Sequence, residues 1–182
     1  IDAAGNESAQ SGEVCGTTLS AVVIGSSISL PKTGQTTSYA AGDDGALQMG
    51  VAWPPTRFTV GTGAEAECVT DNLTGLMWVK SPDSTIRTWA GALDYANGLS
   101  LCGYTDWRLP NRKEMRSLVD YSKYNPALPV GYPFTNVQSD VYWSSSTSAY
   151  LTDFAWLVVM WNGSVNYYTK TSYYYVWPVR AG

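Results

Sequence analysis

The sequence predicts a mixed α+β domain in which two helices pack on an antiparallel sheet. Two segments with helical periodicity lie in the middle of the chain, and four β-prone segments follow them. The dipeptide Asn162-Gly163 joins two of these β-prone segments and is typical of a tight β-hairpin turn. The predicted order is therefore strands, two helices and then a sheet that contains a C-terminal β-hairpin.

The N-terminal region differs in composition from the rest of the chain. Residues 1–50 are rich in Gly, Ala, Ser and Thr, and within them only residues 18–28 resemble a strand. We therefore expect residues 1–29 to form an extended or partly ordered arm, and residues 30–182 to form one domain. Residues 30–34 (LPKTG) match the sortase pattern, but a sorting signal precedes a C-terminal hydrophobic segment, so we interpret this match as coincidence. The chain begins with Ile rather than Met, and we expect that a leader has been trimmed from it.

The first strands and the first helix follow from local signals. Residues 57–60 and 76–80 are predicted strands, and a turn-forming stretch at residues 71–75 precedes the second. Thr88 is the expected N-cap of a helix, and Gly98 is a plausible end for it. The apolar positions of this helix share one face; they are Trp89, Ala92, Leu93 and Ala96.

The second helix begins at Asn111, which forms a capping box with Glu114 in which Asn replaces the usual Ser or Thr. Met115, Leu118 and Val119 line one side of it, and it ends before Pro126. A loop rich in Pro and Gly follows. The predicted strands after this loop are residues 141–146, 154–161, 164–169 and 173–180.

The turn at Asn162-Gly163 also predicts the register of the hairpin. A two-residue turn pairs Trp161 with Ser164 and places alternate side chains on opposite faces. The face predicted to lie in solvent or against a ligand contains Leu157, Val159, Trp161, Ser164, Asn166 and Tyr168. The opposite face, predicted to lie in the core, contains Trp156, Val158, Met160, Val165 and Tyr167.

Composition excludes several classes of function. The chain has no His, so it cannot contain a Ser-His-Asp or Cys-His nucleophile system. Its net charge is −4 and only 14% of its residues are charged, so the chain lacks the basic surface that a nucleic-acid binder needs. No apolar run approaches the length that spans a bilayer. The 13 Tyr and 8 Trp, against 3 Phe, suit a surface that stays wet until a partner binds.

The three cysteines leave two alternatives open. Cys15, Cys68 and Cys102 are either inert thiols, or Cys68 and Cys102 form a disulfide that leaves Cys15 without an internal partner. Such a disulfide would close a loop worth roughly 3–4 kcal/mol in the chain-entropy model. It would also indicate an oxidising compartment.

Four ordered motifs carry a resemblance to a known family. They are residues 70–78 (TDNLTGLMW), 103–114 (GYTDWRLPNRKE), 142–145 (YWSS) and 175–180 (YVWPVR). With these motifs the chain resembles the family of the C-terminal domain of the Legionella collagen-like adhesin. The resemblance implies a C-type-lectin-like fold, no catalytic activity, and export to a cell surface, the extracellular space or a phage particle. The best-described members bind surface ligands and assemble as trimers, so a homo-oligomer is also implied.

Some domains of this family are variable proteins of diversity-generating retroelements, whose mutagenesis rewrites codons near the C-terminus. Residues 150–174 are rich in the residue types that such mutagenesis yields, Tyr, Ser, Thr and Asn. Trp177 stands where the family usually has Arg, and Leu151 and Phe154 lie in a loop that is normally polar. The predicted ligand-binding residues are Tyr150, Leu151, Asp153, Phe154, Leu157, Val159, Trp161, Asn162, Ser164, Asn166, Tyr168, Tyr173, Tyr174 and Trp177.

The function predicted on these grounds is a non-catalytic receptor-binding domain, whose ligand is a protein or a cell-surface receptor. The alternative is an adhesin module for surface glycans, although glycosaminoglycans would need a basic patch. No cofactor or metal is predicted, because Trp161-Asn162-Gly163 lacks the carboxylate that ends the corresponding triplet of calcium-binding lectins. The charged residues between 94 and 116 are expected to be structural, and catalysis by paired carboxylates is a lesser hypothesis.

Overall fold

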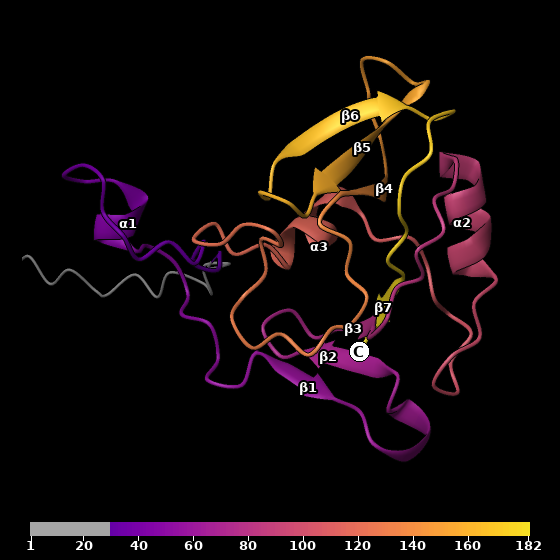
Figure 1. Ribbon diagram of the computed structural model, residues 1–182, viewed down its shortest axis with the longest axis horizontal. Helices are drawn as coiled ribbons and strands as arrows, with labels where there is room; N and C mark the ends of the chain where they lie inside the picture. Colours follow the sequence, from indigo (N-terminus) through magenta and orange to yellow (C-terminus); the bar gives the residue numbers. More distant parts are fainter. Residues whose placement is uncertain (1–29) are drawn as a thin grey trace, which may run out of the picture.

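The computed structural model describes residues 30–182, which form two antiparallel sheets with short helices around them (Figure 1). The expected arm and Cys15 lie outside the described residues. The four-stranded sheet has the order β1-β2-β3-β7; its strands are β1 (Phe58–Val60), β2 (Cys68–Asp71), β3 (Leu76–Val79) and β7 (Val179–Ala181). The three-stranded sheet contains β4 (Val141–Thr147), β5 (Phe154–Val159) and β6 (Val165–Thr169). The helices are α1 (Asp44–Leu47), α2 (Trp89–Asn97), α3 (Arg112–Ser117) and the 3-10 turn η1 (Gly63–Glu65).

The predicted α+β class is confirmed, but the expectation of one sheet is wrong. The two sheets lie at opposite ends of the domain in Figure 1, with β4–β6 at the top. The expected strand at residues 173–180 is not continuous. Tyr174 and Tyr175 form isolated bridges with Arg87 and Tyr142, and the segment joins a sheet only at β7, where Arg180 lies opposite Met77 of β3. Strand β2 was not predicted, because its four residues run directly into the turn at residues 71–75.

Both predicted helix caps are confirmed. The Gly91 N–H donates to Thr88 Oγ1 at 3.3 Å at the start of α2. At α3 the Glu114 N–H donates to Asn111 Oδ1 at 3.0 Å, and the Asn111 N–H donates to Glu114 Oε2 at 2.8 Å. These reciprocal bonds satisfy N–H groups that a helix start otherwise leaves free. Helix α2 packs against β4, while α3 packs against β4 and β5.

The core between the two sheets contains two tryptophans, Trp78 and Trp177, whose rings meet edge to face. Trp177 is completely buried, its Nε1–H donates to the Val79 carbonyl oxygen at 2.8 Å, and its ring centroid lies 5.9 Å from that of Trp78. The edge-to-face arrangement suits the opposite charges of ring face and ring edge. The prediction that Trp177 contacts a ligand is therefore wrong, because its side chain fills the interior and its polar atom already has a partner.

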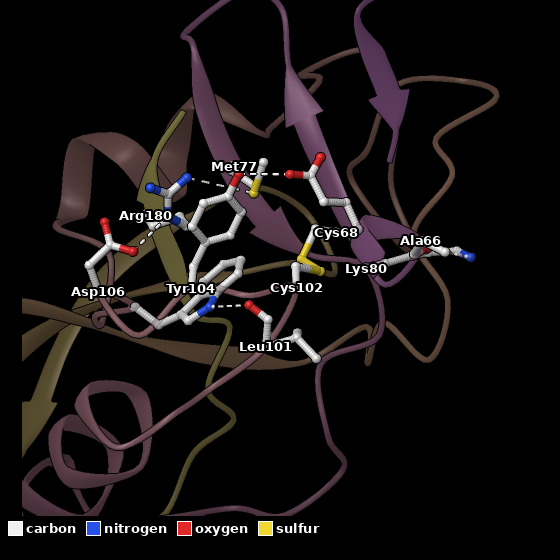
Figure 2. The surroundings of a disulfide bond; sticks show 11 residues. Ala66, Cys68, Met77, Lys80, Leu101, Cys102, Tyr104, Asp106 and Arg180 are labelled. Carbon is white, nitrogen blue, oxygen red and sulfur yellow. Dashed lines mark hydrogen bonds and ion pairs between the residues drawn. A yellow bond between two sulfur atoms is a disulfide. The ribbon is translucent and has the colours of Figure 1, made fainter. Parts of the chain in front are cut away.

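A disulfide joins β2 to the loop after α2 (Figure 2). It links Cys68 and Cys102, whose Cα atoms are 6.5 Å apart. Beside it, Tyr104 Oη donates to Glu65 Oε1 at 2.7 Å, and the Arg180 guanidinium lies over the Tyr104 ring at 3.8 Å. Of the two alternatives that the sequence left open, the structure therefore has the Cys68–Cys102 disulfide. The two cysteines are 34 positions apart in the sequence, and the segment between them contains all of α2.

Candidate ligand-binding surface

The β5–β6 hairpin has a longer loop than the sequence predicts. Leu157 pairs with Asn166, two positions away from the expected pairing with Tyr168, and the loop contains Met160 to Gly163. A type I′ turn needs positive φ at both central residues, but only Gly163 has it, at +77°. Met160 is instead held by other segments, because its N–H donates to the Asp140 carbonyl at 2.8 Å and its carbonyl accepts from the Ala127 N–H at 2.7 Å.

A shift of two positions leaves the predicted division into faces unchanged, because side chains alternate with a period of two. What differs is the burial of each face. Leu157, predicted to be exposed, is only 3% exposed and packs in a cluster with Ala92 and Ala96 of α2. Two residues predicted to lie in the core do not: Trp156 is only half-buried, and Tyr167 is 43% exposed. The reason is that α2 covers part of one face and α3 part of the other, so neither face is wholly core.

The predicted outer face contains a groove of about 240 Å³. We call it the outer groove; it is lined by Val141, Leu157, Val159, Asn166, Tyr167, Tyr168 and Tyr174. Val141 lies beside Val159 on the neighbouring strand, so the two form an apolar floor. Tyr168, which is 52% exposed, meets Tyr174 edge to face at 5.9 Å between ring centroids.

Tyr174 is the more enclosed of the two tyrosines. Its ring also lies 5.0 Å from that of Trp143 in the core. Burial raises the pKa of the Tyr174 hydroxyl, and the neighbouring Tyr168 adds to this effect. The hydroxyl therefore stays protonated at neutral pH and can donate a hydrogen bond to a ligand. The outer groove thus offers apolar contact, aromatic walls and neutral polar groups, and no charged side chain lines it.

Five of the predicted ligand-binding residues line the outer groove together: Leu157, Val159, Asn166, Tyr168 and Tyr174. The sequence missed Val141 and Tyr167. Alternation along the predicted strand at residues 141–146 was a usable signal for Val141, but its pairing partner was unknown. Tyr167 pairs with Trp156, and their ring centroids lie 5.1 Å apart, so its side chain lies on the opposite face and alternation does not place it at the outer groove.

Trp161 lies at the end of the hairpin, outside the outer groove. It is 51% exposed, and its ring centroid is 6.5 Å from that of Tyr124. We call these two residues the aromatic tip. Tyr124 also lines a hollow of about 250 Å³ with mostly polar neighbours, which are Gln35, Thr37, Tyr39, Tyr121, Ser122 and Lys123.

The other predicted residues are spread around the sheet. Tyr150, Asp153, Asn162 and Tyr173 are exposed, whereas Leu151, Phe154 and Ser164 are half-buried, and none of these seven lines the outer groove. Asn162 stabilises the loop, since its Oδ1 accepts from the Ser164 N–H at 3.0 Å. Phe154 packs against Tyr167, with 5.9 Å between ring centroids.

The charged residues near α3 form structural pairs. Arg108 donates from both terminal nitrogens to Glu114, at 2.7 and 2.6 Å, and Arg180 Nε donates to Asp106 Oδ1 at 2.7 Å. Within residues 30–182 we find no group of three or more His, Cys, Asp or Glu side chains placed to hold a metal ion. Among the described helices, none has the length and apolar character needed to cross a bilayer.

The comparisons with known proteins identify a family for most of the domain. The family model described as the Lcl C-terminal domain matches residues 67–180, which is more than half of the chain. The matched region contains the disulfide, α2, α3 and the whole β4–β6 sheet with its outer groove. A search of curated proteins found no match.

Proposed function

Because the chain belongs to the Lcl C-terminal domain family, we propose that it is a non-catalytic, adhesin-like recognition domain with a C-type-lectin-like scaffold. The outer groove is its binding site, and its ligand is a protein on a cell surface. The observation that carries this proposal is the open groove of aromatic and aliphatic side chains on the β4–β6 sheet.

The chemistry of the outer groove suits protein recognition. Tyr168 and Tyr174 provide large, rigid contact area, and ordering a Tyr side chain costs little conformational entropy. Val159 adds apolar surface to the floor, while Asn166 at the rim supplies hydrogen-bonding groups. This combination of an apolar centre and a polar rim is typical of protein–protein interfaces.

The proposal extends to diversification and export. Most residues of the outer groove come from the Tyr- and Asn-rich stretch 150–174, in which a diversity-generating retroelement would act. Asn166 and Tyr168 are exposed, so substitutions there can alter recognition without disturbing the core. The Cys68–Cys102 disulfide supports an oxidising, extracellular setting.

Cell-surface binding of the fluorescently labelled chain tests the proposal. We expect Tyr168→Ser to weaken binding about tenfold or more, since truncating a central aromatic anchor commonly costs more than 1 kcal/mol. Tyr150→Ser is the matched control, because Tyr150 is 89% exposed and outside the outer groove. Treating the cells with protease should abolish binding. Equal loss of binding in both variants, or no loss in either, would contradict the proposal.

One observation favours a second candidate function, which is binding of a neutral glycan. The aromatic tip provides exposed ring surface beside a hollow lined by the side chains of Gln35, Thr37 and Ser122. Sugar rings pack on aromatic faces, and their hydroxyls bond to such polar groups. The net charge of −4 argues against a sulfated glycan. If the ligand is a neutral glycan, Trp161→Ser should remove binding, and glycosidase treatment of the cells should remove it as well. Added salt should leave binding unchanged.

A further inference from the structure

A second hollow lies on the face of β5 opposite the outer groove. It has a volume of about 360 Å³, and we call it the Arg112 hollow; its lining residues are Asn111, Arg112, Lys113, Ser146, Thr147 and Trp156. Trp156 precedes Leu157 in β5, so these two side chains point to opposite faces of the sheet. The two sites therefore share a strand but no lining residue.

The side chain of Arg112 is held in place before any ligand arrives. Its Cζ lies 4.4 Å from the centroid of the Trp156 ring, which is within the range of a cation–π contact. Its backbone N–H donates to Ser146 Oγ at 3.0 Å, which fixes the start of α3 against β4. A guanidinium that is already oriented loses less entropy when it forms further hydrogen bonds.

The charge of Arg112 has no acidic partner among residues 30–182. The salt bridges of this region involve Arg57, Arg87, Arg108 and Arg180, and none involves Arg112 or Lys113. The carboxylate nearest in sequence is Glu114, but Arg108 and the Asn111 N–H already occupy its oxygens. Arg112 is stacked on an aromatic ring, and no carboxylate uses its hydrogen-bond donors. Its guanidinium can therefore bind an external anion.

The rest of the lining also favours an anion. Asn111 Oδ1 accepts two backbone N–H groups, from Lys113 and Glu114, so the free part of this amide is its NH₂ donor. Ser146 Oγ accepts the Arg112 N–H, which leaves its own hydrogen available. Lys113 adds a second positive charge, and no carboxylate lines the hollow.

We propose that the Arg112 hollow binds a carboxylate group of a ligand. The planar guanidinium pairs with a planar carboxylate through two parallel hydrogen bonds, while Trp156 supports it from behind. This site goes beyond the outer groove and does not depend on it.

Titration of the full chain with sodium acetate, followed by NMR of the Trp156 indole N–H and the Arg112 Nε–H, tests the proposal. Sodium chloride is exchanged for acetate so that the ionic strength stays constant. We expect saturable shifts of both signals in the wild type. Arg112→Gln should abolish the response of the Trp156 indole, and Arg112→Lys, which keeps the charge but not the fork, should weaken binding about tenfold.

Arg116→Gln is the matched control. Arg116 is exposed on the same helix, its Nε donates to Tyr121 Oη at 2.7 Å, and it does not line the hollow. This variant should bind acetate like the wild type. Arms with sulfate and phosphate identify the anion, and saturation by either of these without saturation by acetate would overturn the assignment of a carboxylate. Non-saturating shifts, or an unchanged response in Arg112→Lys and Arg112→Gln, would overturn the site itself.

Discussion

A methyl group on Gly163 would lie 2.4 Å from Cγ1 of Val119, so the β5–β6 loop packs directly against the segment that follows α3. The same methyl group would lie 3.3 Å from Cε1 of Tyr121, which belongs to the same segment. The φ of Gly163 is +77°, which a residue with a side chain adopts only at a cost. Two separate constraints, one steric and one conformational, therefore require glycine at this position.

Gly163→Ala should destabilise the domain strongly. We expect a cost of about 1–2 kcal/mol for the left-handed backbone and about 1–3 kcal/mol more for overpacking against Val119. Urea denaturation measures the change in the free energy of unfolding. Gly131→Ala is the matched control, because Gly131 also has a φ of +77° but its added methyl would meet nothing within 4 Å. Equal losses in the two variants would show that the contact with Val119 is unimportant.

Leu157 and Trp161 should differ sharply in their effect on stability. Leu157 is 3% exposed and Trp161 51% exposed, although both lie on the predicted outer side of the hairpin. Leu157→Ser should cost about 2–5 kcal/mol, as truncations of buried leucines do. Trp161→Ser should cost less than about 1 kcal/mol. Thermal melts compare them, and similar losses would mean that α2 does not cover Leu157 in solution.

Loss of the disulfide should destabilise the domain without changing its fold. The double variant Cys68→Ser, Cys102→Ser releases a loop with a separation of 34 residues, for which the chain-entropy model gives about 3–4 kcal/mol. The comparison uses a Cys15→Ser background, so that no third thiol can exchange with the pair. Addition of a reductant should destabilise the parent to the same extent and leave the double variant unaffected. A parent insensitive to reductant would indicate that its cysteines are not paired.

The sequence predicted those features that depend on neighbouring residues. The cap at Thr88 and the capping box of Asn111 and Glu114 involve groups within three residues of each other, and both are confirmed. Strands β1 and β3 were likewise recognised, each predicted one residue longer than observed. Local hydrogen bonding decides such elements, so a single sequence contains the necessary information.

Features that depend on distant segments were not predictable in the same way. The loop of the hairpin is set by the bonds of Met160 to Asp140 and Ala127, which override the preference of Asn162-Gly163 for a two-residue turn. The faces of β5 were divided correctly, but alternation alone cannot show that α2 covers Leu157. Five of the predicted ligand-binding residues line the outer groove, but Val141 of its floor was missed.

The carboxyl group of Glu114 should make stability depend on acidity. Burial raises the pKa of this carboxyl group. The hydrogen bonds from the Arg108 guanidinium and the Asn111 N–H lower it by more than burial raises it, so the pKa lies below its usual value. A lowered pKa in the folded state contributes stability above the pKa of the unfolded chain, about 4.3, and this contribution is lost as the pH falls through the folded value. The difference in stability between the wild type and Glu114→Gln should therefore be constant above about pH 5 and shrink below about pH 4.

Glu67→Gln provides the control for this measurement. Glu67 is exposed and forms no salt bridge with any residue between 30 and 182. Its substitution should leave the pH profile parallel to that of the wild type. Urea denaturation at intervals from pH 7 to pH 3 gives the three profiles. A Glu114→Gln profile that also runs parallel to the wild type would show that the charge of Glu114 does not stabilise the start of α3, and that the capping box acts through neutral hydrogen bonds alone.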